Sequence, residues 1–559
     1  AGLLKVRQLL ETKHPEENFW KSEKTQELYA LIRACLGLEL EAIAIESSVT
    51  SGQSLQVNLS VINRSSIKVE WKRAGLVGDK KDTTLSKRLL NGQPGNTRLL
   101  VPISKAIGMT QPYWLQVPGT VGMYIIAEQN PARYAPGNTA GFVIESMKVE
   151  QQNLIGLAQN SPALIAQFTF SVMDNSINLN YTVPVQYKHT DPVLGELYQP
   201  LVVVPPVMVN IPAARAYVFA DQQPKQVPVT LRAGQAGVAG SLALQVPGGW
   251  QVEPATVPFS LKNKDDEQTV TFNLRPLAGA AEGKTELRAV ATVGGQTYSR
   301  GIQTIEYPHI PTQTLFPEAT APLVRLNVAR GHTKNIGYLM GAGDEVPEAL
   351  RQLGYTVSLL DPATDLTAER LAKYDAVVLG VRAYNVLDKL RTQQPQLLKY
   401  VENGGTMLVQ YVVNRGTVLP EIGPYPLTLS ADRVTVENTP VTFLNSVGGA
   451  IITRQASKPT VPSLSQDLLT TPNKLTKADF EQGWVQEQGL YYPSAWDSHY
   501  QPVIASHDPG ETDKQSAILV APYGKGRYIY TGLSLFRELP AGVPGAFRVL
   551  ANLVESGGK

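Results

Sequence analysis

Residues 335–344 read NIGYLMGAGD and residues 374–380 read YDAVVLG, and these two stretches decide the fold of the C-terminal part of the chain. Each holds a short apolar run that fits one buried strand and is closed by glycine. Similar runs occupy 355–360 and 406–411, and the segments between the four runs have helical periodicity. Strands that alternate with helices at this spacing predict an α/β domain with a doubly wound parallel sheet.

Upstream of this region the apolar periodicity shortens to two residues. Leu55, Val57, Leu59 and Val61 alternate with polar side chains, as in antiparallel strands with one face in solvent. The pattern recurs between turns and predicts antiparallel β-sandwich modules of the immunoglobulin-like kind. The predicted organisation is a helical connector (1–40), a β-sandwich module (41–150), a second β module that can merge with the first (151–212), an Ig-like sandwich (213–306), a linker (307–329) and the α/β domain (330–559).

Residues 1–40 are predicted to form two amphipathic helices. Their apolar stripes are Leu3, Val6 and Leu10 in the first helix, and Leu28, Leu31, Ile32 and Cys35 in the second. We expect the Cys35 thiol to be packed, as free cysteines usually are. Two short helices cannot bury such stripes alone. They are therefore expected to dock on the first sandwich or on a further domain or partner chain, and Leu31→Asp is expected to disrupt that contact.

The composition narrows the classes of partner. The 559 residues carry 50 Lys and Arg against 48 Asp and Glu, without a basic stripe, which argues against a nucleic-acid partner. A single cysteine excludes disulfides within the chain. No apolar run reaches the ~18 residues of a membrane-spanning helix. The amphipathic pattern starts directly after Ala1, so the first residue is expected to be a mature or processed end.

Ligands of open α/β sheets bind beyond the carboxyl ends of the strands. The candidate ligand-binding residues at those ends are Asp344, Arg382, Tyr384, Asn385 and Gln410. Asp344 is equally suited to capping the helix that follows. The Arg382 guanidinium can offer a planar fork to an anion, or it can be used in a structural ion pair with Asp344 or Glu487. No dinucleotide fingerprint or phosphate loop accompanies them, so nucleotide binding is not expected.

Gln410-Tyr411 stands where a class I glutamine amidotransferase would turn onto its cysteine nucleophile. Here Val412-Val413-Asn414-Arg415 follows, which excludes acyl transfer by a cysteine at this place. Two later loops contribute Glu487 and His507 as further candidate ligand residues, expected to close over the strand ends. The histidine and carboxylate spacing there fits no metal motif, so neither a metal nor a cofactor is expected.

Several ordered motifs carry a resemblance to a known family. They are Gly341–Asp344, Gly380–Asn385, Gly404–Thr406, Gly423–Pro426, Trp484–Glu487 and Leu539–Ala546, together with Asp191–Glu196 and Tyr307–Pro311 further upstream. Together they resemble the long C-terminal region of bacterial PIG-L (LmbE-like) family deacetylases, over nearly the whole chain. The resemblance implies Ig-like modules and a terminal domain similar to class I glutamine amidotransferases or ThuA-like proteins. It also implies a periplasmic, cell-surface or secreted location.

In that family, a Rossmann-like domain uses zinc to remove the N-acetyl group of a GlcNAc-type sugar, with a His-Pro-Asp-Asp signature. This sequence holds only His14-Pro15-Glu16-Glu17, between the two predicted helices, so the zinc site is not transferred to it. What remains resembles the accessory portion. Whether a deacetylase domain was cleaved off or never encoded is left open by the sequence.

Three functions follow as hypotheses. The first is a non-catalytic accessory region that binds carbohydrate, such as cell-envelope glycan, or docks a deacetylase domain or partner chain on residues 1–40. The second is a sugar-active enzyme that works through Asp344, Arg382, Glu487 and His507. The third is a cell-surface assembly protein in which exposed sandwich edges pair with one another.

Overall fold

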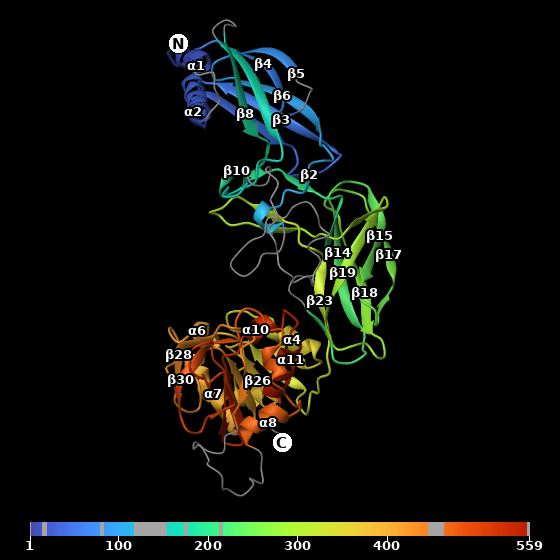
Figure 1. Cartoon of the computed structure of the whole chain (residues 1–559), viewed down its shortest axis with the longest axis vertical. Coiled ribbons are helices and arrows are strands. Elements are labelled where there is room, and N and C mark those ends of the chain that lie inside the picture. Colours follow the sequence, from blue (N-terminus) through green and yellow to red (C-terminus); the bar gives the residue numbers. More distant parts are fainter. Residues whose placement is uncertain are drawn as a thin grey trace.

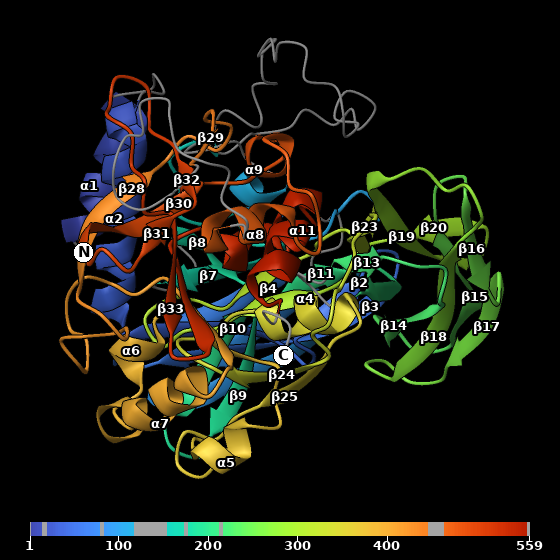
Figure 2. The same ribbon diagram turned by 90° about the horizontal axis from the view of Figure 1, so that it is seen from below.

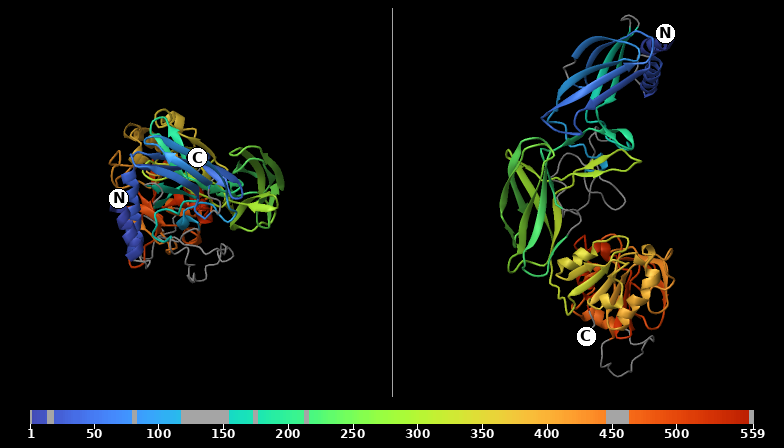
Figure 3. Two further views of the ribbon diagram at one scale, coloured as in Figure 1. Left: turned by 90° about the horizontal axis from the view of Figure 1, so that it is seen from above. Right: turned by 180° about the vertical axis from the view of Figure 1, so that it is seen from behind.

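The computed structural model describes residues 2–13, 19–78, 83–116, 154–172, 177–211, 216–444 and 463–555. An N-terminal β-sandwich with two helices is followed by a second β-sandwich and by a C-terminal α/β domain (Figure 1). The second sandwich lies between the other two along the long axis of the molecule (Figure 3). This multidomain order of β-sandwiches followed by an α/β domain confirms the predicted fold class. In the described ranges, no helix is both long enough and apolar enough to cross a membrane.

The first sandwich pairs a sheet of order β10-β9-β1-β3-β6 with a sheet of order β5-β4-β7-β8. The strands are β1 (Leu38–Ala44), β3 (Ser54–Asn63), β4 (Val69–Leu76), β5 (Thr83–Leu89), β6 (Pro94–Pro102), β7 (Ile165–Val172), β8 (Ile177–Pro184), β9 (Gln186–Asp191) and β10 (Gly195–Pro200). Buried and exposed residues alternate along β3, as its period of two predicts. In the core, Trp71 stacks on Phe168 with 5.6 Å between ring centroids. Strands from 151–212 pair with strands from 41–150, so these two predicted modules share one sandwich; residues 117–153 lie outside the described ranges.

The two predicted helices are α1 (Gly2–Lys13) and α2 (Phe19–Leu36), and α2 packs on the first sandwich through Leu28, Ile32 and Leu36. Two predicted members of its stripe are wrong, because Leu31 is 55% exposed and Cys35 is also exposed. The buried side chains of α2 recur every four residues, so the buried face rotates along the helix toward the side of Tyr29, whose ring contacts Tyr181 edge-on. Leu31 is therefore on a side of the helix that faces away from the sandwich. Val6 of α1 is likewise exposed.

The second sandwich has one sheet of order β12-β14-β18-β16 and one of order β13-β23-β19-β15-β17, with β20 paired to β19. The strands are β12 (Val207–Asn210), β13 (Tyr217–Phe219), β14 (Lys225–Ala233), β15 (Val238–Gln245), β16 (Trp250–Glu253), β17 (Thr256–Leu261), β18 (Glu267–Pro276), β19 (Gly283–Val293), β20 (Gln296–Tyr298) and β23 (Thr320–Arg325). The predicted linker 307–329 is wrong in part, because β23 lies between β13 and β19. Its Ala321 and Leu323 are buried, a short alternation that the prolines around it obscure.

Short pairs of strands join the two sandwiches. They are β2 (Ser48–Thr50) with β11 (Val202–Val204), and β21 (Gln303–Ile305) with β22 (Gln313–Leu315). β22 of the second pair also lies inside the predicted linker. The connection between the sandwiches is therefore itself built of paired strands.

The α/β domain holds a seven-stranded sheet of order β25-β24-β26-β27-β34-β33-β31. Its strands are β24 (Asn335–Leu339), β25 (Thr356–Leu359), β26 (Ala376–Leu379), β27 (Thr406–Gln410), β31 (Gln501–Pro502), β33 (Ile518–Tyr523) and β34 (Gly526–Thr531). The four strands predicted from 335–411 are parallel, and β34 continues the parallel set. The sequence-based prediction of a doubly wound parallel sheet is thus confirmed. At the end of the sheet, β33 is antiparallel to β34, and β31 is antiparallel to β33.

Helices cover both faces of this sheet (Figure 2). One face packs against α4 (Val346–Gln352), α8 (Leu464–Thr470), α9 (Ala478–Glu481), α10 (Leu535–Glu538) and α11 (Pro544–Leu553). The other packs against α5 (Ala368–Leu371), α6 (Ala383–Val386) and α7 (Leu390–Glu402). A ribbon of β28 (Leu427–Val434) and β30 (Gly489–Trp496) and the pair β29 (Thr442–Phe443) and β32 (Ile504–Ala505) complete the domain.

The second sandwich and the α/β domain share apolar packing. Val218 and Val324 of the sandwich belong to the same buried cluster as the residues of α4 and α11. At this junction, Nζ of Lys225 donates hydrogen bonds to the main-chain oxygen and Oε1 of Gln352 at 2.5 and 3.1 Å. Burial lowers the pKa of Lys225 to about 8. The junction is therefore a packed interface rather than a free hinge.

Candidate functional site

The loops that follow β24, β26 and β27 are joined to one another by main-chain hydrogen bonds. The Ala342 N–H donates to the oxygen of Val381, and the Arg382 N–H donates to the oxygen of Tyr411, both at 2.9 Å. A Cβ at position 341 would lie 2.1 Å from the Val381 oxygen, so only glycine allows this approach. The predicted crevice between these strand ends is thus closed by backbone contacts.

Asp344 fills the space that remains at this edge. Its Oδ1 accepts hydrogen bonds from the Tyr338 hydroxyl at 2.6 Å and from the Val346 N–H at 3.0 Å, and its Oδ2 accepts one from the Val381 N–H at 3.1 Å. Burial raises the pKa of Asp344, while these three donors oppose the shift. The capping alternative therefore describes Asp344, and the predicted ligand role does not, because its oxygens are already engaged.

Three further candidates also serve the interior. Gln410 is buried and donates from Nε2 to the Tyr338 hydroxyl at 2.7 Å. Tyr384 is fully buried, and its hydroxyl accepts from Nε2 of Gln394 at 3.4 Å. Asn385 exchanges hydrogen bonds with the main chain of Val413 at 3.0 and 3.1 Å. These side chains support the strand ends and do not face a ligand.

Arg382 is the exception among the strand-end candidates. Its side chain is exposed, and its backbone is left-handed with φ 59°. The predicted pairing alternative is wrong, because the Asp344 oxygens are taken by other donors and, within the described ranges, no carboxylate forms an ion pair with Arg382. Its guanidinium therefore remains available at the surface.

A group of aromatic side chains lies beside Arg382, at the ends of β27 and β34. We define the aromatic shelf as Tyr411, Tyr491 and Phe536. The rings of Tyr411 and Tyr491 stack with 5.8 Å between centroids and 13° between planes. Phe536 lies 5.2 Å from Tyr411 at a tilt of 41°. Tyr411 is mostly covered, whereas Tyr491 and Phe536 are partly exposed, so the shelf presents ring surface to solvent.

Two guanidinium groups act electrostatically on Tyr411 of the shelf. Burial raises the pKa of Tyr411, and the positive charges of Arg382 and Arg537 oppose that shift. The Arg537 guanidinium also lies over the Phe536 ring, 4.9 Å from its centroid. Both guanidinium groups are therefore within electrostatic range of the Tyr411 hydroxyl, next to the apolar ring faces of the shelf.

Glu487 also lies beside the shelf, but its carboxylate is not free to bind a ligand. Its carboxylate forms an ion pair with Arg537, and its second oxygen lies 3.9 Å from Arg433. With 12% of its side chain exposed, it orients Arg537 against the shelf. Glu487 thus lies near the strand ends, as predicted, but the positive charge of Arg537 already compensates its carboxylate.

The backbone around the shelf adopts an unusual conformation at three positions. Arg382, Gln486 and Tyr491 have positive φ values of 59°, 66° and 56°. In the described ranges, only Ser86 and Asp265 share this property among residues other than glycine. Left-handed conformations cost free energy in such residues and tend to gather at functional sites. The clustering of three here distinguishes the shelf from the rest of the described surface.

Glu538 supports the loop that carries Gln486 and Glu487. Its carboxyl oxygens accept hydrogen bonds from the Val485 N–H at 2.8 Å and the Ser534 hydroxyl at 3.2 Å. Burial raises the pKa of Glu538 to about 8. The loop over α10 is thus fixed from beneath by a carboxyl group that does not reach the surface.

The side chain of His507 makes its described contacts within its own loop. Its Nδ1 lies 2.9 Å from the main-chain oxygen of Asp508, and its Nε2 lies 3.7 Å from Asp513. Asp508 in turn accepts from the N–H groups of Thr435 and Val436, at the end of β28. None of these contacts reaches Arg382 or the shelf, and the closure of His507 over the strand ends remains a prediction. Among the residues with described positions, no group of three or more histidine, cysteine or acidic side chains is arranged to hold a metal.

Sequence reasoning missed Tyr491, Phe536 and Arg537 as site residues. Phe536 and Arg537 follow β34, the fifth parallel strand, whose apolar run 526–531 was a usable signal. Tyr491 had no such signal, since its position depends on the irregular pairing of β28 with β30 and on its own positive φ. Tyr411 appeared only as the position of a missing nucleophile.

The sequence matches no protein-family model and no curated protein. Solved structures with some similarity include a putative GMP synthase subunit from Thermoplasma acidophilum, 13% identical over 40% of this chain and 93% of that chain, with a TM-score of 0.25. A putative ThuA-like protein from Bacteroides uniformis is 11% identical over 41% of this chain and 92% of that chain, with a TM-score of 0.27. Escherichia coli alpha-2-macroglobulin is 11% identical over 53% of this chain and 22% of that chain, with a TM-score of 0.17. At these TM-scores, the assignment of the α/β domain rests on its own strand order.

Proposed function

We propose that this chain is a non-catalytic carbohydrate-binding region and that its aromatic shelf binds an anionic sugar. The observation that carries the proposal is that two guanidinium groups, Arg382 and Arg537, lie close enough to the partly exposed Tyr411–Tyr491 stack to act electrostatically on Tyr411. Aromatic faces pack against the apolar C–H faces of sugar rings, and guanidinium groups form paired hydrogen bonds with carboxylate or phosphate. A neutral sugar would leave Arg382 without a counter-charge.

The biological setting belongs to the same proposal. The resemblance of the motifs to PIG-L family proteins suggests that the region serves a deacetylase acting on GlcNAc-type sugars, in the periplasm or at the cell surface. A binding role fits the shelf better than catalysis does. The one carboxyl group beneath it with a raised pKa, Glu538, is buried and engaged by two donors, so it cannot reach a bound sugar.

The test measures the affinity of the full chain for an oligogalacturonate and for a neutral chito-oligosaccharide by isothermal titration calorimetry. We expect the acidic ligand to bind at least about tenfold more tightly, a difference of about 1.4 kcal/mol. The preference should shrink as salt is raised, because the Arg382 charge is exposed to solvent.

Two variants connect the binding to the shelf. Arg382→Gln removes the free guanidinium, and Tyr491→Asn removes one ring while retaining a residue that tolerates the left-handed backbone. Each should lower the affinity for the acidic ligand about tenfold at an unchanged melting temperature. Arg391→Gln, an exposed site on α7, is the matched control and should change nothing. Equal affinities for the two ligands, or full affinity in Arg382→Gln, would refute the proposal.

A further inference from the structure

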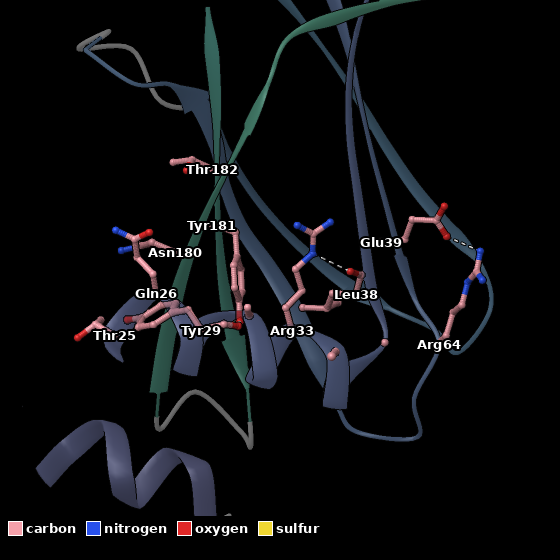
Figure 4. A pocket seen from close by; sticks show the side chains of 13 residues that line it. Thr25, Gln26, Tyr29, Arg33, Leu38, Glu39, Arg64, Asn180, Tyr181 and Thr182 are labelled. Carbon is pink, nitrogen blue, oxygen red and sulfur yellow. Dashed lines mark hydrogen bonds and ion pairs between the residues drawn. The ribbon is translucent and has the colours of Figure 1, made fainter. Parts of the chain in front are cut away.

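A second recessed surface lies at the other end of the molecule, on the first sandwich. It is an open groove with a volume of about 780 Å³, bounded by α2, β8 and the start of β1. Figure 4 shows α2 crossing one end of the groove, with Asn180 and Thr182 on β8 at one side and Leu38 on β1 at the other. Two different sheets of the sandwich thus border the same space.

The β8 side of the groove is a free strand edge. β8 is the terminal strand of the sheet β5-β4-β7-β8, and it pairs only with β7. The Asn178 oxygen accepts a hydrogen bond from Arg7, and the Val185 N–H donates to Leu164 beside β7. Even-numbered residues of β8 therefore direct their main-chain groups away from β7, because these groups alternate along a strand. The N–H and C=O groups of Asn180 and Thr182 consequently face the groove.

The β1 side has the same property over its first half. β9 pairs with β1 only at Ile43 and Ala44. The Leu38 oxygen points away from β3, since it accepts a hydrogen bond from Nε of Arg33 at 3.0 Å. The groove thus runs between the free edge of β8 and the part of β1 that β9 does not cover. In the described ranges, neither Asn180 nor Thr182 has a main-chain partner on this side.

Over residues 178–182 the edge lacks the features that normally prevent pairing with another chain, and the proline of β8, Pro184, stands at the end of the strand. Protected edges carry charged side chains, prolines or bulges. Residues 178–182 read NLNYT, without charge or proline, and their pairing with β7 is regular. The helices contact β8 at two described places: Arg7 of α1 donates to the Asn178 oxygen at 2.8 Å, and the Tyr181 hydroxyl donates to the Tyr29 oxygen of α2 at 3.3 Å. The remainder of the edge is accessible from the groove.

The charge in the groove indicates the kind of partner. Arg64 is compensated by Glu39, and Nε of Arg33 is used by Leu38. The outer nitrogens of Arg33 point into the space between β8 and β1 (Figure 4), and no carboxylate of the described ranges pairs with them. A second copy of this chain would bring another Arg33 toward the same place, which like charges oppose. A partner with an acidic side chain would supply the missing counter-charge.

From the free edge of β8 and the uncompensated Arg33, we infer that this groove binds an extended, acidic peptide segment of another protein. The segment adds one strand to β8 through the main-chain groups of Asn180 and Thr182, and a carboxylate of the segment pairs with Arg33. Main-chain hydrogen bonds provide affinity in such strand addition, and side-chain contacts provide selectivity. This inference is independent of the aromatic shelf and of its ligand.

The probe is a fluorescent peptide of about nine residues, long enough to span the eight residues of β8. It alternates threonine and valine, carries one central glutamate, and is N-methylated along one edge to prevent self-association. A second peptide carries lysine in place of glutamate. Fluorescence anisotropy with the full chain should show at least tenfold tighter binding of the glutamate peptide. Arg33→Gln should abolish this difference, whereas the exposed Arg88→Gln should retain it.

Two measurements test the strand edge itself. Asn180→Pro removes an N–H that β7 does not use, so it should fold as before but bind either peptide at least tenfold more weakly. Hydrogen exchange should show that the glutamate peptide slows exchange at Asn180 and Thr182, while Leu179 and Tyr181 are already protected. The inference is overturned by equal binding of the two peptides, by full binding to Asn180→Pro, or by protection confined to other segments. Absence of binding at millimolar peptide would also overturn it.

Discussion

The Tyr338 hydroxyl donates a hydrogen bond to Oδ1 of Asp344 at 2.6 Å and accepts one from Nε2 of Gln410 at 2.7 Å. These two hydrogen bonds connect the ends of β24 and β27, and the three side chains occupy the place where an open α/β sheet usually holds its ligand. The carboxyl edge of this sheet is consequently divided. The part near β24 is structural, and the exposed functional groups lie in the segments that follow β26, β27 and β34.

Tyr338→Phe should destabilise the α/β domain without affecting the aromatic shelf. The substitution removes the donor to Asp344 and the acceptor for Gln410, which leaves two buried polar groups without this partner. We expect the free energy of unfolding to fall by about 1–3 kcal/mol in chemical denaturation. Tyr425→Phe is the control, because its hydroxyl donates to Pro522 at a more exposed place. An equal loss in both variants would contradict the proposed buried network.

Substitutions at neighbouring positions of α2 should have opposite outcomes. Ile32→Asp places a charge in the core of the first sandwich and should destabilise it by more than about 3 kcal/mol. Leu31→Asp should change the melting temperature little, because Leu31 is largely exposed. This result would correct the sequence-based expectation for Leu31. Differential scanning calorimetry of both variants is sufficient, and similar losses would argue that α2 has been placed in the wrong rotation.

The glycines after β24 should differ in their tolerance of a side chain. Gly341→Ala would place a Cβ 2.1 Å from the Val381 oxygen, and the backbone there is held by hydrogen bonds on both sides. We expect a loss of at least about 3 kcal/mol in unfolding free energy. Gly343→Ala meets no atom within 4 Å and pays only for its φ of 106°. It should therefore cost less, about 1–2 kcal/mol, and the reverse order would show that the loops are not joined as described.

The sheet could be predicted from sequence because three of its four strands between 335 and 411 are buried apolar runs and helical segments separate the strands; the fourth, β25, is a partly exposed edge strand. The site could be predicted only in part. Arg382 was found because it directly follows a strand, and the cap role of Asp344 was an open alternative. The shelf itself combines Tyr411, Tyr491 and Phe536 from three distant segments. Such a combination depends on strand order and on local left-handed backbone, neither of which leaves a periodic signal.

The burial of Glu538 should make stability depend on pH in a defined direction. Its pKa is raised from 4.5 to about 8, so the folded protein retains a proton that the unfolded chain releases between these values. Unfolding is then favoured progressively as the pH rises through this window, and the stabilising effect of the protonated group is complete only below about pH 4.5. At 1.36 kcal/mol for each unit of pKa, the effect is about 5 kcal/mol at most.

Glu538→Gln imitates the protonated carboxyl group and can still accept from the Val485 N–H. The variant should therefore lose less stability than the unsubstituted protein between pH 5 and 8, which thermal unfolding at several pH values would measure. The comparison is made as a difference between the two proteins, because Lys225, with its pKa lowered to about 8, contributes in the opposite direction above that pH in both. Parallel pH profiles would show that Glu538 is already ionised in the folded state. A narrowing of the difference toward pH 5 would instead establish that the loop carrying Gln486 and Glu487 rests on a neutral carboxyl group.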